Sequence, residues 1–438
     1  MEAEIEKSLI QATSLMDQIR HRSFLENENG FDALAKALKY PETLSYVDFL
    51  ERYERQDIAN RVVSSPVDAT WATDPKVGES VREDTPFEKG WNKIVGETSL
   101  FSVFSKVDLL GRLGHYAVLF LGASDGTDLS KEIKSGSSLK YINALPEPNV
   151  KIVGWEDSII SERFGAPKYY DIQIETNGGE SVMNRTVHWS RIIHIAQDTV
   201  SNKYYGIPSL LPIYNRLLGL EKLASGSPEM YWRGARPGYV ASSGGNVLAT
   251  DKQIDDFKVA ISDFVNNLNR YLYAEDLKVH SLAPQVVTPR EHVDVQLQLI
   301  SAAMRIPLRI LIGSERGELS SDQDERAWLN YIESRRDKIG KKLIISPFID
   351  RLLKYNMLEP PKNEYFIRWE PLVVLSDKDR AEVARLYSDA IKKYDDSITA
   401  RDIIPPDVFK KYILSLDEEA IALSDNILEE SLKEEDLS

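Results

Sequence analysis

The most suggestive catalytic motif spans residues 122–126 and fits the pattern G-x-S-x-G. In hydrolases this pattern places a nucleophilic serine on a sharp turn between a strand and a helix, with a histidine and an acid later in the chain. The residues that follow, 127–132, are polar and acidic instead of apolar and helical. We therefore interpret the motif as an Asp-Gly hairpin turn that carries a serine. A hydrolase that uses Ser124 stays as an alternative.

Histidines supply the second candidate for chemistry. His21 and His188 each begin an H-x-S sequence, which is half of the signature of two-histidine phosphoesterases. None of the six histidines has the i, i+4 partner of a helical zinc site, and the chain contains no cysteine. These facts exclude a Cys/His metal cluster, a thiolate nucleophile and disulfide bonds. A phosphoesterase that uses His188 stays as a second alternative.

Nucleotide-binding and metal-binding motifs are also weak. The sequence contains neither G-x-x-x-x-G-K-[ST] nor G-x-G-x-x-G, so we expect no nucleotide and no other cofactor. Asp322, Asp324 and Glu325 have the oxygens that a divalent cation prefers. We interpret them instead as acids that complement the positive end of a helix capped by Ser320 or Ser321, and we expect no metal.

The most unusual polar segment is a charged loop at 313–321. Two glycines bracket its tip and give it conformational freedom, and its one guanidinium is flanked by two carboxylates. Taken alone, these residues are interpreted as an exposed connector. The loop consists of Gly313, Ser314, Glu315, Arg316, Gly317, Glu318, Leu319 and Ser320.

Composition limits the class of protein. The chain has 438 residues, 42% hydrophobic and 28% charged, and is long enough for roughly three domain-sized units. No run approaches the ~20 apolar residues of a membrane span, so no membrane contact is expected. The net charge of −15 is the reverse of what a protein that grips phosphates needs. By itself it suits a soluble protein.

Hydrophobic periodicity predicts a mixed α+β body. We expect a helix from 44 to a stop before Pro66, a helix near 87–91, and a helix from 100 that leads into a strand at 116–121. Further strands are predicted at 150–153, 169–174 and 191–195, and a strand at 365–369 should complete the same sheet. The long helix from Asp322 should kink at Pro347.

Two helices with an insert between them dominate the middle of the chain. The first is predicted over 206–235, although Pro228 favours a break and a restart at Ser227. The second follows a capping box at Thr288, with a proline at the first helical position. Between them, 236–285 should fold as strand, amphipathic helix at 250–269 and two strands, at 270–273 and 277–280.

The order of these pieces resembles the portal proteins, or head-tail connectors, of tailed bacteriophages. The resemblance is carried by a helix that ends in Arg-Gly-Ala-Arg-Pro-Gly at 233–238, by Arg-Ile-Pro-Leu-Arg-Ile-Leu-Ile-Gly-Ser at 305–314, and by the loop before Asp322. It implies an α+β portal fold with wing, stem helices, α/β clip, tunnel loop and helical crown, assembled as a ring. Twelve subunits are expected from it.

The resemblance also implies a division of the chain. The wing would comprise 1–205, with about 25 mobile residues at its start, and 306–375, with the tunnel loop and a long helix at 322–357. The stem helices would be 206–235 and 286–305. The clip would be 236–285, and the crown 376–438 with an acidic C-terminal tail.

In the same way the resemblance implies roles for residues. The loop at 313–320 would face DNA in the tunnel. Stem or channel positions would be Arg216, Glu221, Lys222, Arg290 and Glu291. Contacts between clips in the ring would be made by Tyr239, Phe257, Phe264, Tyr271 and Tyr273.

The implied function is structural and not enzymatic. A dodecamer at one capsid vertex would form a channel for viral genome packaging and ejection in a virion assembled in the host cytoplasm. Its partners would be its own copies, the major capsid protein, a scaffold protein, the terminase large subunit, a head-completion or adaptor protein, and passing double-stranded DNA bound without sequence specificity. A non-viral ring-forming scaffold protein is a third alternative.

Overall fold

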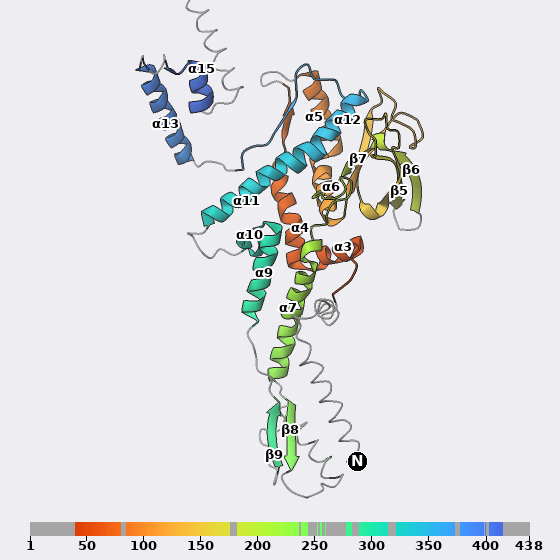
Figure 1. Cartoon of the computed structure of the whole chain (residues 1–438), viewed down its shortest axis with the longest axis vertical. Coiled ribbons are helices and arrows are strands. Elements are labelled where there is room, and N and C mark those ends of the chain that lie inside the picture. Colours follow the sequence, from red (N-terminus) through yellow and green to blue (C-terminus); the bar gives the residue numbers. More distant parts are fainter. Residues whose placement is uncertain are drawn as a thin grey trace, which may run out of the picture. The chain divides into compact units, whose positions relative to one another are not determined.

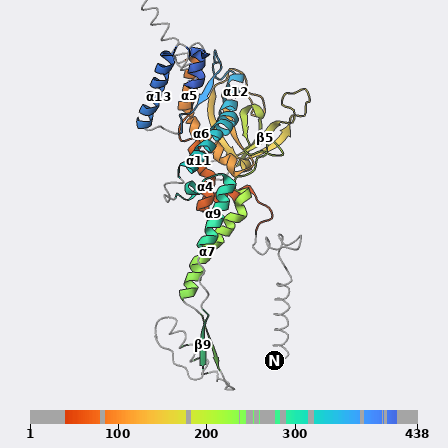
Figure 2. The same ribbon diagram turned by 60° about the vertical axis from the view of Figure 1, so that its left-hand side comes forward.

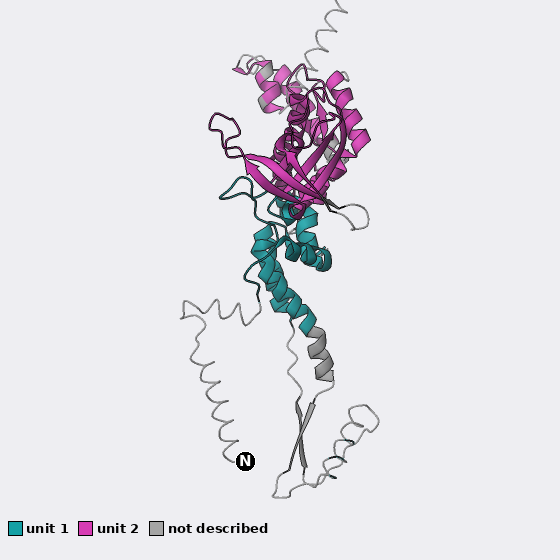
Figure 3. Cartoon of the chain, turned by 90° about the vertical axis from the view of Figure 1, so that its right-hand side faces the viewer, with its two compact units in different colours: residues 1–66, 111–116, 196–328 teal, residues 67–110, 117–195, 329–438 magenta. Residues whose placement is uncertain are grey.

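The structure is a computed structural model that describes residues 40–79, 85–175, 182–235, 238–243, 252, 255, 259, 277–282, 289–313, 321–372, 377–397, 399 and 403–414. The chain forms two compact units (Figure 3). Unit 1 contains residues 1–66, 111–116 and 196–328, and unit 2 contains residues 67–110, 117–195 and 329–438. Each unit is therefore assembled from segments that lie far apart in the sequence.

Unit 2 contains a three-stranded antiparallel sheet with strand β2 (Ala117–Ala123) at its centre. β2 pairs with β3 (Leu139–Pro146) on one side and with β7 (Ile192–Ile195) on the other. Its first six residues are buried, as their continuous apolar run predicts. β2 and β3 are joined through residues 124–138, so the Asp-Gly pair does not form the tight two-residue hairpin that the sequence suggested.

Two further antiparallel sheets belong to unit 2. One consists of β4 (Val150–Trp155), β5 (Pro167–Glu175) and β6 (Val182–His188). The other pairs β1 (Lys76–Gly78) with β10 (Phe366–Arg368). The prediction that the strand near 366 completes the main sheet is thus wrong: its partner is a three-residue strand too short for hydrophobic periodicity to reveal.

An aromatic core fills unit 2. Helix α5 (Pro86–Thr98) begins with a capping box in which Thr85 accepts from the Glu88 amide and the Glu88 carboxylate accepts from the Thr85 amide. Its Trp91 packs edge-on against Phe348, with ring centroids 6.2 Å apart. Phe104 of α6 (Leu100–Leu113) meets the same ring at 5.2 Å. These side chains are at most 2% exposed.

A long helical segment changes register before Pro347. It runs as α11 (Ser321–Arg335), a π-helical segment (Arg336–Ile345) and α12 (Ser346–Lys354). The predicted helix at 322–357 is therefore present with slightly different ends. Because proline lacks an amide hydrogen, the chain loses one helical hydrogen bond at Pro347, and the wider π register precedes it.

Buried charges hold the π-helical segment in unit 2. The Trp71 indole donates to one oxygen of Asp108 at 2.8 Å, and Arg335 donates to the other. Asp108 and Arg335 are fully or almost fully buried. The next guanidinium, that of Arg336, donates to the Thr70 carbonyl at 3.2 Å. Two successive arginines thus tie this segment to the residues around 70 and to α6.

Unit 1 begins with two helices where the sequence predicted one. Helix α3 (Tyr46–Arg55) is capped at Ser45, and α4 (Asp57–Thr70) follows after a break at Gln56. Gln56 adopts an extended backbone conformation, φ −111° and ψ 124°. The predicted stop before Pro66 is wrong, because α4 continues past this proline.

Helix α7 (Tyr214–Ala235) starts eight residues later than the predicted stem helix at 206, after a 3-10 turn at Leu211–Ile213. Gly206 explains the delay: its amide donates to the His115 carbonyl at 2.7 Å, and its Cα approaches the Gln197 backbone. This contact holds the chain in a non-helical conformation. The break suggested at Ser227 and Pro228 does not occur, because α7 is continuous to Ala235.

Helix α9 (Arg290–Met304) follows the insert and lies beside α7 in Figures 1 and 2. Pro289 precedes the helix as its N-cap and is not its first helical residue, and Thr288 lies outside the described residues. The short α10 (Leu308–Ile312) follows. In the insert, strands are present at the predicted positions 239–241 and 277–280, as β8 (Gly238–Ser243) and β9 (Leu277–Leu282), and the two pair with each other.

Several predictions lie wholly or partly outside the described residues. These are the N-terminal arm to residue 39, the strand at 270–273 and the acidic tail after 414; in the predicted helix at 250–269, the described positions 252, 255 and 259 are helical. The C-terminal helices are α13 (Asp377–Asp395) and α15 (Pro406–Val408), the latter extended by a π turn at Phe409–Ile413. The rings of Tyr394 and Phe409 stack with centroids 4.0 Å apart.

Two glycines of unit 1 should respond oppositely to alanine. A Cβ at Gly206 would lie 1.9 Å from the Gln197 carbonyl oxygen, which is backbone and cannot move aside cheaply. We expect Gly206→Ala to lower the free energy of unfolding by on the order of 1–3 kcal/mol and the thermal unfolding midpoint by several degrees. Differential scanning calorimetry at fixed concentration measures this.

Gly226→Ala is the matched control. Gly226 lies inside α7 with open space around its Cα, so alanine should stabilise the helix by up to about 1 kcal/mol. Equal midpoints for the two variants would contradict the close approach at Gly206.

Candidate functional site

The α7–α9 pair of unit 1 is held by a narrow apolar seam. Leu217 and Leu220 of α7 are buried, as is Ile300 of α9. Val293 and Leu297 of α9 are half-buried on the same face as Ile300, at the i, i+4, i+7 spacing of one helical stripe. This seam leaves the other faces of both helices available.

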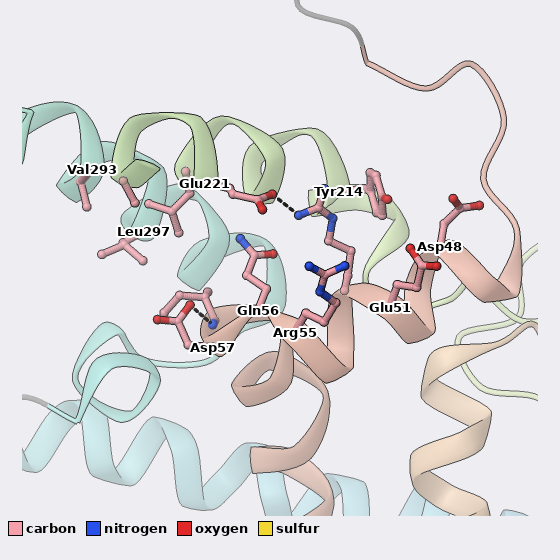
Figure 4. A pocket seen from close by; sticks show the side chains of 13 residues that line it. Asp48, Glu51, Arg55, Gln56, Asp57, Tyr214, Glu221, Val293 and Leu297 are labelled. Atoms are coloured by element: carbon pink, nitrogen blue, oxygen red, sulfur yellow. Dashed lines mark hydrogen bonds and ion pairs between the residues drawn. The ribbon is translucent and has the colours of Figure 1, made fainter. Parts of the chain in front are cut away.

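A cleft of about 690 Å³ opens where α3 and the start of α4 meet the α7–α9 pair (Figure 4). Apolar side chains of α7 and α9 form one side of it, and charged side chains of α3 the other. It is lined by Asp48, Glu51, Arg52, Arg55, Gln56, Asp57, Ile58, Tyr214, Leu220, Glu221, Ala224, Val293 and Leu297.

An ion pair crosses the cleft. Arg52 of α3 donates to the Glu221 carboxylate of α7, and its guanidinium carbon lies 5.5 Å from the centroid of the Tyr214 ring. Burial opposes a charge at Arg52, but hydrogen bonding with Tyr214 and Glu221 outweighs it and raises the arginine pKa above its ordinary value. The guanidinium therefore stays charged and ties α3 to α7.

Gln56 gives the cleft an unmet hydrogen-bonding group. Its Nε2 donates to the Leu217 carbonyl at 3.0 Å, whereas its Oε1 is buried and accepts from no donor among the described residues. A buried acceptor without a donor costs roughly 1–3 kcal/mol.

The predicted stem positions are not equivalent. Arg216, Lys222 and Glu291 are exposed, and Lys222 lies 5.1 Å from the centroid of the Tyr40 ring. Arg290 pairs with Asp294 on its own helix at 3.9 Å. Glu221, in contrast, is the partner of Arg52.

The predicted tunnel loop is described only at its first residue. Gly313 ends α10 with a left-handed φ of +68°, which favours glycine. Ser314, Glu315, Arg316, Gly317, Glu318, Leu319 and Ser320 lie outside the described residues. Of the predicted clip contacts, Tyr239 belongs to strand β8, while Phe257, Phe264, Tyr271 and Tyr273 lie outside them as well.

The serine motif at 122–126 has a structural role in unit 2. The Ser124 hydroxyl contacts the Ser138 hydroxyl at 2.7 Å and accepts from the Ser138 amide, and among the described residues no histidine is bonded to it. The neighbouring Asp125 is 2% exposed and binds Arg191 and Thr127. The motif therefore fastens the connection between β2 and β3.

His188 is likewise structural. It is 8% exposed, and its Nδ1 lies 3.0 Å from the Ser190 hydroxyl and accepts from the Ser190 amide. It thereby caps the 3-10 turn Trp189–Arg191. Burial lowers the histidine pKa, which favours this neutral, accepting form. His188 is thus engaged in local structure.

Neither a metal cluster nor a membrane span is found in the part of the chain that the structure describes. There, no group of three or more histidines and carboxylates is placed to hold a metal ion. Within the same ranges, no helix is long and apolar enough to cross a bilayer. Asp324 and Glu325 are exposed near the start of α11, which begins at Ser321 and not at Asp322.

Comparison of the sequence with family models gives a match to the phage portal proteins over residues 48–393, well over half of the chain. The chain belongs to this family. A portal protein is a structural component and not an enzyme, in agreement with the surroundings of Ser124 and His188. A search of curated protein sequences gave no match.

Solved structures share the fold of this portal protein. A chain in the neck of an empty gene transfer agent (GTA) particle, computed with C6 symmetry, aligns with TM-score 0.53 and 14% identity over 80% of this chain and 90% of that chain. A chain in the neck of the native particle, computed with C12 symmetry, aligns with TM-score 0.52 and 13% identity. The alignment covers 81% of this chain and 92% of that chain. An HK97-family portal protein from Corynebacterium diphtheriae aligns with TM-score 0.41 and 10% identity. The alignment covers 74% of this chain and 94% of that chain.

Sequence reasoning missed the cleft of this portal protein and its ion pair. Arg52 and Glu221 are 169 residues apart, and no local pattern links them. One signal was present: Arg52 and Arg55 lie in the last turn of an amphipathic helix, where side chains are available to a neighbouring helix.

Asp125 should make the stability of this portal protein depend on acidity. Burial alone would raise its pKa, but hydrogen bonds from Thr127 and Arg191 lower it to about 2, from an ordinary 3.8. The carboxylate therefore contributes about 2 kcal/mol above pH 5, and this is lost as the pH falls from about 4 to 2. We expect Asp125→Asn to destabilise the protein at pH 7 and to flatten the fall in unfolding free energy below pH 5.

Chemical denaturation across pH 2–7 measures both effects. Asp157→Asn, which changes an exposed aspartate in unit 2, is the control and should leave the curve unchanged. A pH dependence that is the same in Asp125→Asn and in the unmodified protein would contradict the assignment.

Proposed function

We propose that this protein forms a ring around a channel at one capsid vertex, through which double-stranded DNA enters and leaves the virion. The observation that carries the proposal is the portal family match over 48–393. The fold shared with neck chains from particles computed with C6 and C12 symmetry supports a ring, and twelve subunits are the proposed number.

The proposed division of labour follows the chain. Residues 206–235 and 286–305, which contain α7 and α9, form the stem around the channel. The insert at 236–285, with the β8–β9 pair, forms the clip. Residues 1–205 and 306–375 form the wing, and 376–438 the crown.

Weak contact with DNA is proposed for the loop after Gly313. Arg316 supplies one guanidinium per subunit, and Glu315 and Glu318 beside it prevent tight phosphate binding. The net charge of −15 per chain also opposes tight binding, because the ring as a whole repels DNA. A duplex can therefore slide past the ring without being trapped.

The partners follow from this role. The sequence contains no phosphate-binding loop, so the energy for moving DNA is proposed to come from the terminase large subunit. The major capsid protein and a scaffold protein would surround the ring during assembly in the host cytoplasm. A head-completion or adaptor protein would replace the terminase after packaging.

The ring itself is tested by mass photometry and negative-stain imaging of the purified full-length protein. We expect closed rings with an axial hole and a mass near twelve times the 49.7 kDa protomer. A compact dimer, or a ring with no hole, would contradict the proposed channel.

The loop is tested in a packaging assay. Because Arg316 supplies the only guanidinium of the loop, we expect Arg316→Ala to form normal rings but to package less DNA, several-fold less at low salt, and Arg316→Glu to package less still. Lys93→Ala, which removes an exposed cation of α5, is the control. Normal packaging by Arg316→Glu would contradict the proposed contact between this loop and DNA.

A further inference from the structure

Helix α9 carries a second apolar stripe on the face opposite its seam with α7. Val295 is 50% exposed and Leu299 40% exposed, and Ala302 is exposed as well. These positions have the i, i+4, i+7 spacing of one helical face, which points away from the face of Val293 and Leu297. We name Val295, Leu299 and Ala302 the outer stripe.

The cleft described above lies on the other side of the same helix. Val293 and Leu297 of α9 line it together with Leu220 and Ala224 of α7. It therefore offers apolar surface from both helices. One helical pair thus exposes two different apolar surfaces, on opposite sides of α9.

The charges around these surfaces are complementary. Since Arg52 is paired with Glu221, the remaining charges of the cleft are three carboxylates and one guanidinium, those of Asp48, Glu51, Asp57 and Arg55. Exposed Arg305 follows Ala302 by three residues at the C-terminal end of the outer stripe, and exposed Glu291 precedes Val295 by four residues at the other end. An acidic cleft thus corresponds to a stripe with a basic end, and the same acids disfavour DNA as the occupant of the cleft.

We propose that the outer stripe of one copy packs into the cleft of the next copy, and that this contact closes the ring. The inference rests on the proposed ring and assigns its interface. Two different surfaces on one protomer give a head-to-tail contact, which generates a closed ring when the rotation between copies allows it.

The first test places charge on the outer stripe. Val295 and Leu299 are exposed in the protomer, so the double variant Val295→Asp/Leu299→Asp should keep its fold, as checked by circular dichroism, while a buried aspartate disfavours the contact. We expect mass photometry to show protomers in place of rings at concentrations where the unmodified protein is fully assembled.

Val200→Asp is the matched control, because Val200 is 82% exposed in unit 1 and belongs to neither surface. It should form normal rings. Rings formed by the double variant would overturn the interface and leave the ring itself intact. Absence of rings from the unmodified protein would overturn the proposed ring and the interface together.

The second test joins the two surfaces covalently. The chain contains no cysteine, so two introduced cysteines can pair only with each other or with their copies. We expect Leu299→Cys/Ala224→Cys, after mild oxidation of the assembled ring, to give a ladder of linked chains on a non-reducing gel. Each single cysteine variant should stay uncrosslinked under the same conditions. Assembled rings of the double variant without a ladder would overturn the proposal.

Discussion

The buried ion pair between Asp108 and Arg335 constrains the packing of unit 2, because it joins α6 to the long helical segment. Both side chains are almost completely removed from water, and removing one partner of such a pair typically costs about 3–5 kcal/mol. Trp71 satisfies the second oxygen of Asp108, whereas Nε and Nη1 of Arg335 are buried without an acceptor among the described residues. The aromatic packing of Trp91, Phe104 and Phe348 offsets this desolvation. The pair lies at the end of α11, directly before the π-helical segment begins at Arg336.

Unit 1 is stabilised differently. The pair of helices α7 and α9 has too little mutual surface to be stable alone. The seam between α7 and α9 covers one face of each helix, and the Arg52–Glu221 pair adds α3 as a third element. Apolar surface remains on both sides of α9. Such exposed apolar surfaces are suited to contacts with further chains, and the proposed ring would cover them.

The motifs that looked most like chemistry proved to be structural for a common reason. Ser124, Asp125 and His188 are polar residues that end a strand or begin a turn, where backbone groups need partners. A catalytic triad uses the same residue types, and spacing in the sequence does not distinguish the two uses. The distinction came from partners: Ser138 for Ser124, Arg191 for Asp125 and the Ser190 amide for His188.

The sequence by itself determined the α+β class, most helices and strands, and the family, because periodicity and the order of motifs are local properties of the chain. It misplaced the start of α7, which is delayed by the approach of Gly206 to Gln197, and it missed the break at Gln56 and the pairing of β10 with β1. It also did not reveal the cleft or the ion pair across it. Only the tertiary structure decided these features, because each depends on residues that are distant in the chain or on a backbone contact that leaves no periodic trace.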